Sequence, residues 1–512
     1  MDKKKVIIIG AGPGGLAAGM LLASKGYEIT VLEKQEYVGG RNSAIKLGDY
    51  TFDMGPTFLS MPHIAEEIFA ECERNLHDYL DLKELEDMYE LIFPDKSMMV
   101  SRNPEKMRDS IEAHFPGEGR GYDRFMTETK SRMDALTPIL QGKMDRFYHY
   151  FQWKVLKALP YLSFGSSLYD QLSKYFQHEQ LKLAFTFQSK YLGMSPWECP
   201  GAFSILSWME HEYGIYHPIG GVNKLSEAMA KVIEEYGGAV KLNTPVKKLL
   251  LKGRAVQGVE LADGTKVKAD EVVVNGDFAH VMTSLVDEGI LQKYSNKKLA
   301  KKKYSCSTFM IYLGLNKQYN LPHHTIIFAD DYKKNVEEIT VSKKLSKDPS
   351  IYIQNASVTD PTLAPDGKSA LYILAPVPNN FSQIDWETHK ESFRDLVFDT
   401  LEKKSGFKNL RAHIEEERIL TPNDWEKEVL VYKGATFNLG HQLSQMMVLR
   451  PHNQFEELKN CWLVGGGTHP GSGLPTILES ARISTRLLEE KHAISSSNPF
   501  LSQKSTRMEK VQ

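Results

Sequence analysis

The stretch KKKVIIIGAGPGGLAAGMLLASKGYEITVLEKQ, residues 3–35, decides the fold of this chain. A short apolar run ends in a turn of glycines, a helical segment follows, and a second apolar run closes the unit. The pattern predicts a strand over 6–9, a helix to about Ser24 and a strand over 28–33. A basic start and an apolar centre are also typical of a signal peptide, but glycines break the apolar run and no clear cleavage site follows. We therefore interpret the stretch as a strand–helix–strand unit.

The glycine turn has the G-x-G-x-x-G spacing of a dinucleotide site. Gly10 permits the tight turn, Gly12 lets backbone approach a pyrophosphate, and Gly15 lets the helix pack on the strand. The helix N-terminus offers free N–H groups to phosphates, and Glu33 can accept a hydrogen bond from a ribose hydroxyl. The alternative is a glycine-rich turn without a ligand. The residues predicted to bind the dinucleotide here are Gly10, Ala11, Gly12, Pro13, Gly14, Gly15, Glu33 and Lys34.

A second glycine turn, in YVGGRNSAIKLGDYTFDMGPTFLS (37–60), distinguishes flavin from nicotinamide. Gly40 and Arg41 add bare backbone and a cation that can run beside the pyrophosphate of an extended FAD. The alternative for Arg41 is a surface ion pair. This arrangement resembles the glutathione-reductase-type FAD proteins of the amine oxidase and carotenoid desaturase group. By the same resemblance, the stretch that ends in Gly55, Pro56 and Thr57 brings backbone near the flavin ring.

Composition excludes several other classes of protein. Lys and Arg number 63 and Asp and Glu 65, so nothing indicates nucleic-acid binding. The four cysteines are scattered without a C-x-x-C pair, which argues against a metal site or a disulfide framework and suits a reducing cytoplasm. No uninterrupted apolar run reaches the roughly 18 residues that a membrane-spanning helix needs.

At 512 residues the chain is expected to form two intertwined domains. Helix formers dominate residues 64–215, and short alternating runs after about 239 predict a strand followed by a meander. Val246 is expected to face the adenine, and Asp277 to follow a core strand. We expect an FAD-binding domain over 1–90, 215–285 and 445–493, a substrate and membrane-associated domain over 91–214 and 286–444, and a disordered tail over 494–512.

The stretch GGGTHPGSGLPTILESA (465–481) lies between the strand-like CWLVGG and a helical pattern. A helix that begins at about Pro475 would point its N-terminus at the negative charge of reduced flavin near N1 and O2. The alternative is a structural loop. The predicted flavin contacts are Gly466, Gly467, Gly473, Leu474 and Pro475. His469 is the candidate acid–base group, although a purely structural bond from its imidazole fits the pattern better.

The same stretch looks like the C-terminal signature of bacterial carotenoid desaturases of the phytoene and diapophytoene type, within the amine-oxidase-like flavoproteins. DYTFDMGPTFLSMP (49–62) and TPNDWEKE (421–428) resemble the same family, and the likeness covers roughly residues 5–490. It implies an α/β fold, with a Rossmann-like FAD-binding domain of the glutathione-reductase type and an inserted α+β domain. It also implies that two hydrogens leave adjacent carbons of a long isoprenoid, that FAD accepts the hydride, and that a quinone or oxygen reoxidises it.

Three alternatives stay open at this point. They are a diapocarotenoid terminal-methyl oxygenase, in which the Thr-His-Pro pattern tends to be lost, a polyamine or amino acid oxidase, and a flavin-free prenyl carrier such as a Rab GDP-dissociation inhibitor. A lipid-soluble substrate also calls for a membrane surface. Residues 144–176 mix aromatics, leucines and lysines in a way typical of peripheral membrane contact, the alternative being an ordinary pair of core helices. We expect a cytoplasmic protein attached peripherally to the membrane, with a thirty- or forty-carbon substrate.

Overall fold

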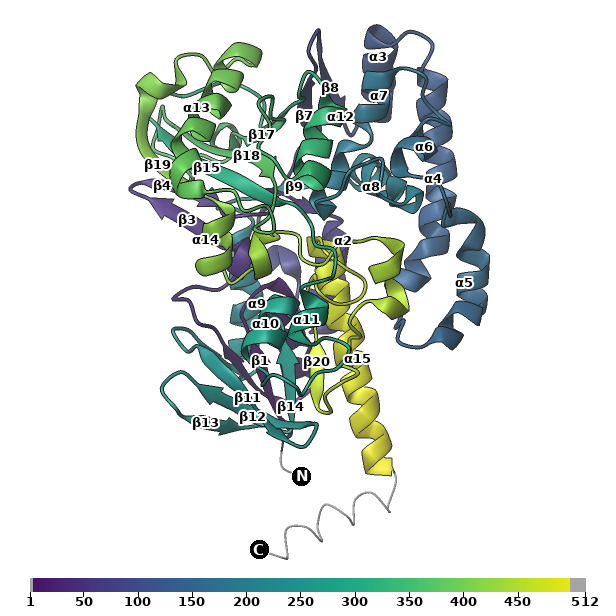
Figure 1. The fold of residues 1–512 in the computed structure, drawn as a ribbon, viewed down its shortest axis with the longest axis vertical. Coiled ribbons are helices and arrows are strands. Elements are labelled where there is room, and N and C mark those ends of the chain that lie inside the picture. Colours follow the sequence, from purple (N-terminus) through teal and green to yellow (C-terminus); the bar gives the residue numbers. More distant parts are fainter. Residues whose placement is uncertain (1–2, 498–512) are drawn as a thin grey trace, which may run out of the picture.

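The architecture is built on a parallel sheet of five strands, in the order β10-β2-β1-β14-β20 (Figure 1). The structure is a computed structural model that describes residues 3–497. The predicted strand–helix–strand unit is confirmed, because the first two strands pair in parallel across an intervening helix. The elements of this unit and its sheet are β1 (Lys5–Ile9), α1 (Pro13–Ser24), β2 (Glu28–Leu32), β10 (Ala239–Lys241), β14 (Glu271–Val274) and β20 (Cys461–Leu463).

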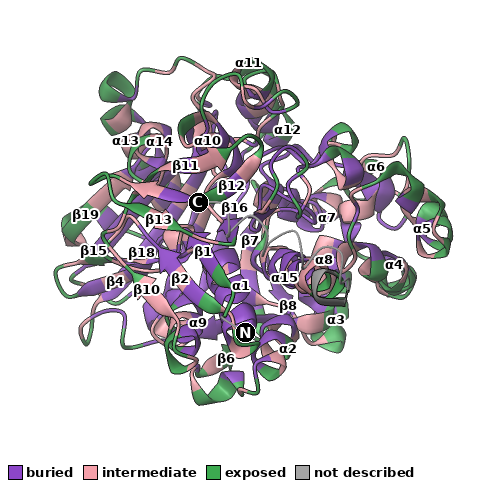
Figure 2. Cartoon of the chain, turned by 90° about the horizontal axis from the view of Figure 1, so that it is seen from below, coloured by how far each residue is buried: buried purple, intermediate pink, exposed green. Residues whose placement is uncertain are grey.

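Both faces of this sheet are covered, which is why its strands are almost continuously apolar. Val6 and Ile8 pack into the core beside α1, whereas Ile7 and Ile9 pack into a second core that includes Leu249. Figure 2 shows the buried residues gathered around β1, β2 and α1. Helices α9 (Asn223–Glu235) and α15 (Leu474–Ser497) flank α1. The opposite face carries the predicted meander, which is confirmed as β11 (Val246–Lys252), β12 (Ala255–Leu261) and β13 (Lys266–Lys268).

A second large sheet has seven strands in the order β19-β15-β18-β17-β16-β7-β8. Two of its strands, β7 and β8, fall in the region whose composition indicates helix. β7 pairs with β8 next to it in the chain, but it also pairs in parallel with β16, with Glu90 opposite Thr325. This long-range pairing overrides local composition. The bounds are β7 (Asp87–Ile92), β8 (Ser97–Ser101), β15 (Ser307–Leu315), β16 (His324–Ile327), β17 (Ile351–Gln354), β18 (Ser369–Val377) and β19 (Ile414–Leu420).

Helices from the middle of the chain form a separate group beside the two sheets, on the right in Figure 1. This group consists of α3 (Pro104–His114), α4 (Gly119–Leu140), α5 (Trp153–Ala158), α6 (Leu168–Leu172), α7 (Glu179–Ala184) and α8 (Ile205–Tyr213). The remaining strands are β3 (Ala44–Leu47), β4 (Tyr50–Asp53), β5 (Leu59–Ser60), β6 (Leu82–Glu84) and β9 (Ile215–Pro218). The remaining α-helices are α2 (Pro62–Glu71), α10 (Phe278–Ser284), α11 (Asn296–Leu299), α12 (Tyr332–Glu337), α13 (Trp386–Lys404) and α14 (Pro422–Lys427).

The end of the described chain is helical. Residues 494–497, expected in the disordered tail, continue α15, and the rest of that predicted tail, 498–512, lies outside the described residues. Between residues 3 and 497, no helix combines the length and the apolarity that crossing a membrane requires.

Candidate functional site

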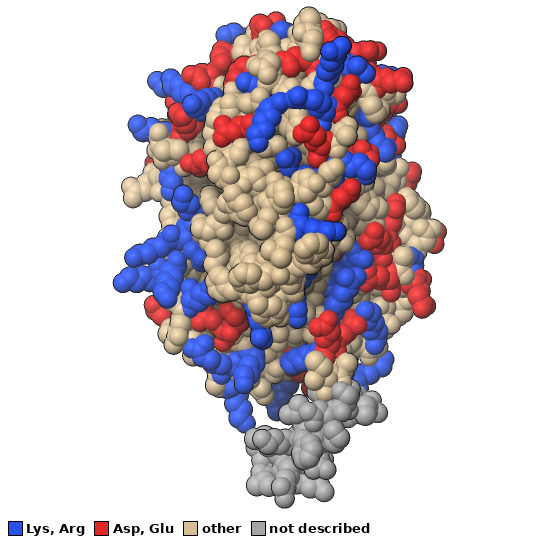
Figure 3. All heavy atoms as spheres, turned by 90° about the vertical axis from the view of Figure 1, so that its right-hand side faces the viewer, with Lys and Arg blue, Asp and Glu red and all other residues tan. Residues whose placement is uncertain are grey.

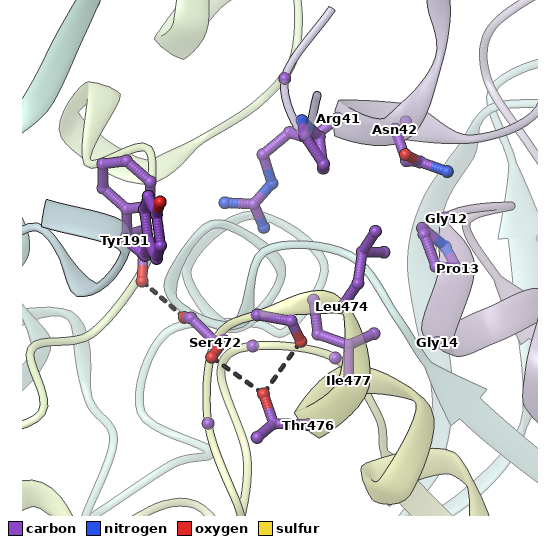
Figure 4. Close-up of a pocket in the computed structure, with 18 of the residues that line it drawn as sticks. Gly12, Pro13, Gly14, Arg41, Asn42, Tyr191, Ser472, Leu474, Thr476 and Ile477 are labelled. Carbon is purple, nitrogen blue, oxygen red and sulfur yellow. Dashed lines mark hydrogen bonds between the residues drawn. The ribbon is translucent and has the colours of Figure 1, made fainter. Parts of the chain in front are cut away.

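A cavity of about 750 Å³ is lined by the five-stranded sheet, the seven-stranded sheet and the group of helices from the middle of the chain. One part of its wall is the glycine turn after β1, where Gly10 adopts a φ of 94°, a conformation that favours glycine. Gly12 caps α1 without a side-chain bond, so the first N–H groups of the helix remain available to an anion. Gly12, Pro13 and Gly14 line the cavity (Figure 4).

Ala11 and Gly15 of the same glycine motif do not line the cavity, and they contact neighbouring protein atoms instead. A Cβ on Gly15 would lie 2.4 Å from the Gly10 carbonyl oxygen, so Gly15 is required for packing. The Ala11 N–H donates to Glu33 Oε2 at 2.8 Å. The packing role predicted for Gly15 agrees with this position, and a contact of Gly15 or Ala11 with the dinucleotide stays a prediction.

Glu33 lies at the end of β2 and is buried, with 7% of its surface exposed. Its second oxygen, Oε1, accepts from the Gln35 N–H at 2.9 Å, and the side chain still lines the cavity. Each carboxylate oxygen has a further lone pair, so the carboxylate can also accept from a ribose hydroxyl. Lys34 lines the cavity next to it, as does Val246 at the start of β11.

Arg41 extends into the cavity and does not form a surface ion pair (Figure 4). Its guanidinium donates to the Thr436 carbonyl at 2.5 Å. Burial lowers the pKa of Arg41, and the charge of Asp277 opposes that change. Asp277, which caps α10, also lines the cavity. The Arg41 cation and the Asp277 carboxylate therefore line the same cavity, although they lie far apart in the sequence.

Three tyrosines of the seven-stranded sheet hold the stretch that was expected to approach the flavin ring. Tyr312 donates to the Met54 carbonyl at 2.6 Å, and Tyr372 donates to the Gly55 carbonyl at 2.9 Å. The Tyr352 hydroxyl lies 2.5 Å from the Thr57 hydroxyl. Gly55, Pro56 and Thr57 all line the cavity.

The C-terminal loop closes the cavity opposite Arg41 (Figure 4). Gly473 has a φ of 114°, and the Thr476 hydroxyl donates to the carbonyls of Ser472 and Gly473 at 2.8 and 2.9 Å. α15 begins at Leu474, so Pro475 is its second residue and not its first as expected. Gly40, Gly466, Gly473, Leu474 and Pro475 line the cavity.

Gly467 and His469 do not line the cavity, unlike the other residues of this loop that were predicted to contact the flavin. A Cβ on Gly467 would lie 2.5 Å from Phe278 Cβ, so this glycine packs against α10. His469 Nε2 lies 3.1 and 3.0 Å from the carbonyls of Ile139 and Gly142, at the end of α4. Burial lowers the pKa of His469 to about 4. The structural alternative for His469 fits this geometry, and the acid–base role does not.

We expect His469→Gln to keep the flavin content and the rate of flavin reduction close to wild type, because glutamine can still donate a hydrogen bond to a carbonyl. His469→Ala should lower stability by about 1–3 kcal/mol, since it leaves buried carbonyls without a donor. Single-turnover reduction and thermal unfolding measure the two effects. General acid–base catalysis contributes roughly 10²–10⁴-fold, and a loss of that size in His469→Gln would restore the catalytic role.

The rest of the wall is mostly apolar and was missed by sequence reasoning. It comes from the helical group and from the seven-stranded sheet, and no local motif distinguishes its residues from ordinary core. This part of the wall includes Phe187, Tyr191, Leu206, Met209, Met310, Ile326, Tyr352, Tyr372 and Leu374. A signal that could have found them is the density of aromatic residues just before Gly193, but that density is also typical of a core.

Several ionisable side chains lie in this wall, namely Lys190, Glu479, His63, Glu67 and His441. Lys190 donates to Ser350 Oγ at 2.9 Å, and burial lowers its pKa to about 7. Glu479 forms an ion pair of 2.8 Å with Arg482 on the same helix and accepts from Gln141.

The residues present fit FAD. The uncapped N-terminus of α1 and Arg41 provide donors and a positive charge for the pyrophosphate, and Glu33 provides the acceptor for a ribose. Gly473 has no side chain and adopts a positive φ, so bare backbone lies where the ring would approach. In the part of the chain that the structure describes, no cluster of three or more His, Cys, Asp or Glu residues could hold a metal ion.

Comparison with known proteins identifies the family. Residues 13–487 match the family described as flavin containing amine oxidoreductase. The 4,4'-diapophytoene desaturase (4,4'-diapolycopene-forming) of Methylomonas sp is 50% identical over 493 residues, which cover 96% of this chain and 96% of that protein. The all-trans-zeta-carotene desaturase of Myxococcus xanthus is 35% identical over 495 residues, covering 95% and 93%. A solved oxidoreductase from Methanosarcina mazei has a TM-score of 0.62 at 17% identity, covering 95% and 100%.

The solved structure is similar in fold, and its low identity carries no further argument. The two desaturases match almost the whole length of the chain. These matches confirm the predicted family and favour it over the oxygenase, the amine oxidase and the flavin-free carrier. The chain belongs to the flavin containing amine oxidoreductases and, within them, to the carotenoid desaturases.

Proposed function

We propose that the protein is an FAD-dependent desaturase that introduces conjugated double bonds into a linear carotene precursor of the diapophytoene or phytoene type. The observation that carries the proposal is the continuity of the cavity, whose wall runs from the glycine turn and Arg41 to a largely apolar region. A hydrocarbon has no polar group to anchor, so an apolar wall beside a flavin site is the arrangement that this reaction needs. The 50% identical relative supports the thirty-carbon substrate class.

The chain itself positions the reactants and excludes water. FAD, when bound, supplies the acceptor for the hydride. The dinucleotide would be held by a Rossmann-like domain that contains the parallel sheet. This domain consists of segments 1–90, 215–285 and 445–493. Residues 91–214 and 286–444 would hold the hydrocarbon. Tyr352 and Tyr372 fix the backbone of 55–57, and the N-terminus of α15 would favour negative charge on the reduced ring.

Expression in cells that supply either diapophytoene or phytoene tests the proposal. We expect pigment with extended conjugation from the thirty-carbon precursor, and the visible absorption spectrum gives the number of double bonds. Purified flavoprotein reduced by the precursor in lipid, with and without oxygen or a quinone, identifies the oxidant. Unchanged spectra of both precursors, in cells that contain flavin-loaded protein, would contradict the proposed reaction.

We further propose that the protein contacts the membrane through the aromatic face, which consists of Phe147, Tyr148, Phe151, Trp153, Leu156, Leu159 and Phe164. Phe151 and Trp153 are 78% and 70% exposed, which is unusual for side chains of this size. Figure 3 looks onto the side of the molecule that carries α4 and α5, and shows a broad area without charged residues, bordered by Lys and Arg together with some Asp and Glu. Lys154 of α5 donates to the Pro138 carbonyl of α4 at 3.2 Å. α4 supplies Thr137 and Leu140 to the cavity wall, so the face lies beside the substrate space.

The triple variant Phe147→Ser, Phe151→Ser and Trp153→Ser is expected to lose at least roughly tenfold of its binding to anionic vesicles. Each large apolar side chain transferred out of water contributes about 1.5–3 kcal/mol when fully buried, and insertion here is partial. Flotation with vesicles and a flavin-content assay measure binding and integrity. Val341→Ser is the matched control, because Val341 is 65% exposed at a different place. Equal loss in both variants, or none in the triple variant, would reject the aromatic face.

A further inference from the structure

Arg450 is a buried guanidinium placed behind the C-terminal loop. It is 0% exposed, and all of its hydrogen bonds go to backbone carbonyls. Two of those carbonyls belong to the loop, with Nε 3.0 Å from the Thr468 oxygen and one terminal nitrogen 2.6 Å from the Gly466 oxygen. The other acceptors are the carbonyls of Leu439, Gly440 and Gln445, at 3.3–3.4 Å.

No carboxylate neutralises this charge among the side chains that the structure describes, since Arg450 takes part in no ion pair. The nearby Glu456 instead accepts from Lys293 and from the Tyr294 hydroxyl. Burial lowers the pKa of Arg450 to about 10, so the guanidinium stays protonated near neutral pH. A buried charge without a counter-ion is costly, and carbonyl dipoles offset only part of that cost.

The imidazoles nearest to this charge are neutral. Burial, together with the positive charge of Arg450, lowers the pKa of His441 well below its ordinary value. Burial also lowers the pKa of His469, and Arg450 lowers it further. His441 Nε2 accepts from the Ser472 N–H at 3.0 Å and so holds the loop as a neutral ring. Arg450 is therefore the cation on this side of the loop.

The loop places this cation one peptide away from the cavity. Gly465, Gly466 and Gly473 line the cavity, and Gly466 is the residue whose carbonyl binds Arg450 most closely. We propose that Arg450 is a positioning residue whose uncompensated charge stabilises the anionic, reduced form of the bound flavin and raises its reduction potential. In the low-dielectric interior a charge acts over more than contact distance. The Gly466 carbonyl, which binds Arg450, belongs to a residue that lines the cavity.

The inference rests on the FAD site of the proposed function, but not on the identity of the hydrocarbon. Without Arg450, the reduced flavin loses stabilisation relative to the oxidised flavin, while both keep the contacts of the glycine turn. If Arg450 had only a structural role, its replacement would change stability and flavin content. Lysine and glutamine, which are similar in length, would then affect flavin reduction equally at this position.

Arg450→Gln and Arg450→Lys, loaded with FAD, test the charge by equilibration with a reference dye at one poised potential. We expect the ratio of reduced to oxidised flavin to fall at least roughly tenfold in Arg450→Gln, about 30 mV for a two-electron couple. Arg450→Lys keeps the charge and should stay within about threefold of wild type. Arg132→Gln is the matched control, because Arg132 is 7% exposed and bonds to Tyr161 and Ser204, and none of these three residues lines the cavity. An unchanged ratio in Arg450→Gln, or an equal fall in Arg450→Lys, would overturn the proposal.

A second measurement uses the wild-type protein, and it can overturn the proposal even if Arg450→Gln does not retain flavin. Reconstitution with 8-mercapto-FAD reports where the flavin keeps its negative charge. A cation near N1 and O2 draws the negative charge of the 8-mercapto-flavin from the sulfur into the ring, which gives the long-wavelength quinoid spectrum. We expect this quinoid spectrum. The thiolate spectrum of the free flavin would overturn the proposal. Neither measurement uses a carotene, so a failure of the desaturase assignment would leave both results readable.

Discussion

Replacing Gly12 by valine is expected to leave the purified protein with less than about a tenth of the wild-type FAD content. The backbone at Gly12 has a φ of −75° and a ψ of 170°, so valine fits the local conformation. Its Cβ, however, would lie 2.8 Å from Asn275 Nδ2, and that amide donates to the Gly10 carbonyl at 3.1 Å. The added methyl groups also occupy space that the pyrophosphate must approach. An overpacking penalty of about 3 kcal/mol corresponds to roughly a hundredfold weaker binding.

The ratio of flavin absorbance to protein absorbance, followed by FAD titration of the apoprotein, measures this loss. Glu33→Ala should weaken FAD binding as well, because it removes the ribose acceptor and the bonds to Ala11 and Gln35. Gly264→Ala serves as the control, since Gly264 has a φ of 88° and a Cβ there would meet nothing within 4 Å. It should cost about 1 kcal/mol of stability and keep its flavin. Full flavin retention in Gly12→Val would refute this placement of the dinucleotide.

Gly473→Val is expected to lower the flavin content and the rate of flavin reduction together, by roughly tenfold to a hundredfold. At a φ of 114° any residue with a Cβ is strained, at a cost of about 1–3 kcal/mol. The Cβ would also lie 3.3 Å from the Thr476 hydroxyl, whose bonds to Ser472 and Gly473 shape the start of α15. A displaced helix N-terminus would no longer face the ring.

Single-turnover reduction by precursor delivered in lipid gives the rate for Gly473→Val, and absorbance gives the flavin content. Gly289→Val is the matched control, because Gly289 has a φ of 87° with open space around it and lies outside the cavity wall. It carries a comparable backbone strain without touching the loop. If Gly473→Val binds flavin and is reduced at the wild-type rate, the loop does not approach the ring and the assignment of 465–481 is wrong.

The dinucleotide side of the site could be predicted because its decisive residues lie close together in sequence. Gly10, Gly12 and Glu33 mark the turn, the helix start and the strand end within one unit, and local backbone rules fix their relative places. The C-terminal loop was predictable for the same reason, as its glycines stand directly before α15 and Pro475 lies in the first turn of that helix. The division into two domains and the membrane contact stay predictions.

The substrate side could not be predicted, because burial and contact with a ligand leave the same apolar pattern. Tyr191 and Met209 look like core residues in the sequence, and only the fold shows that they line a cavity. The partners of His469 could not be predicted for a related reason. Its partners are carbonyls at the end of α4, about 330 residues away, and nothing near Thr468 and Pro470 indicates them.

The order of the chain along the parallel sheet has a consequence for biosynthesis. The glycine turn after β1 leaves the ribosome early, but the edge strand β20 and the first turn of α15 follow about 450 residues later. At a translation rate of roughly 5–20 residues per second, the glycine turn and the segment of β20 and α15 are synthesised about 20–90 seconds apart. During that interval the apolar strands around β1 lack one flanking helix, and the nascent chain cannot be stabilised by its prosthetic group. Holoenzyme assembly is therefore a post-translational event, and a chaperone that shields the early strands would govern its yield.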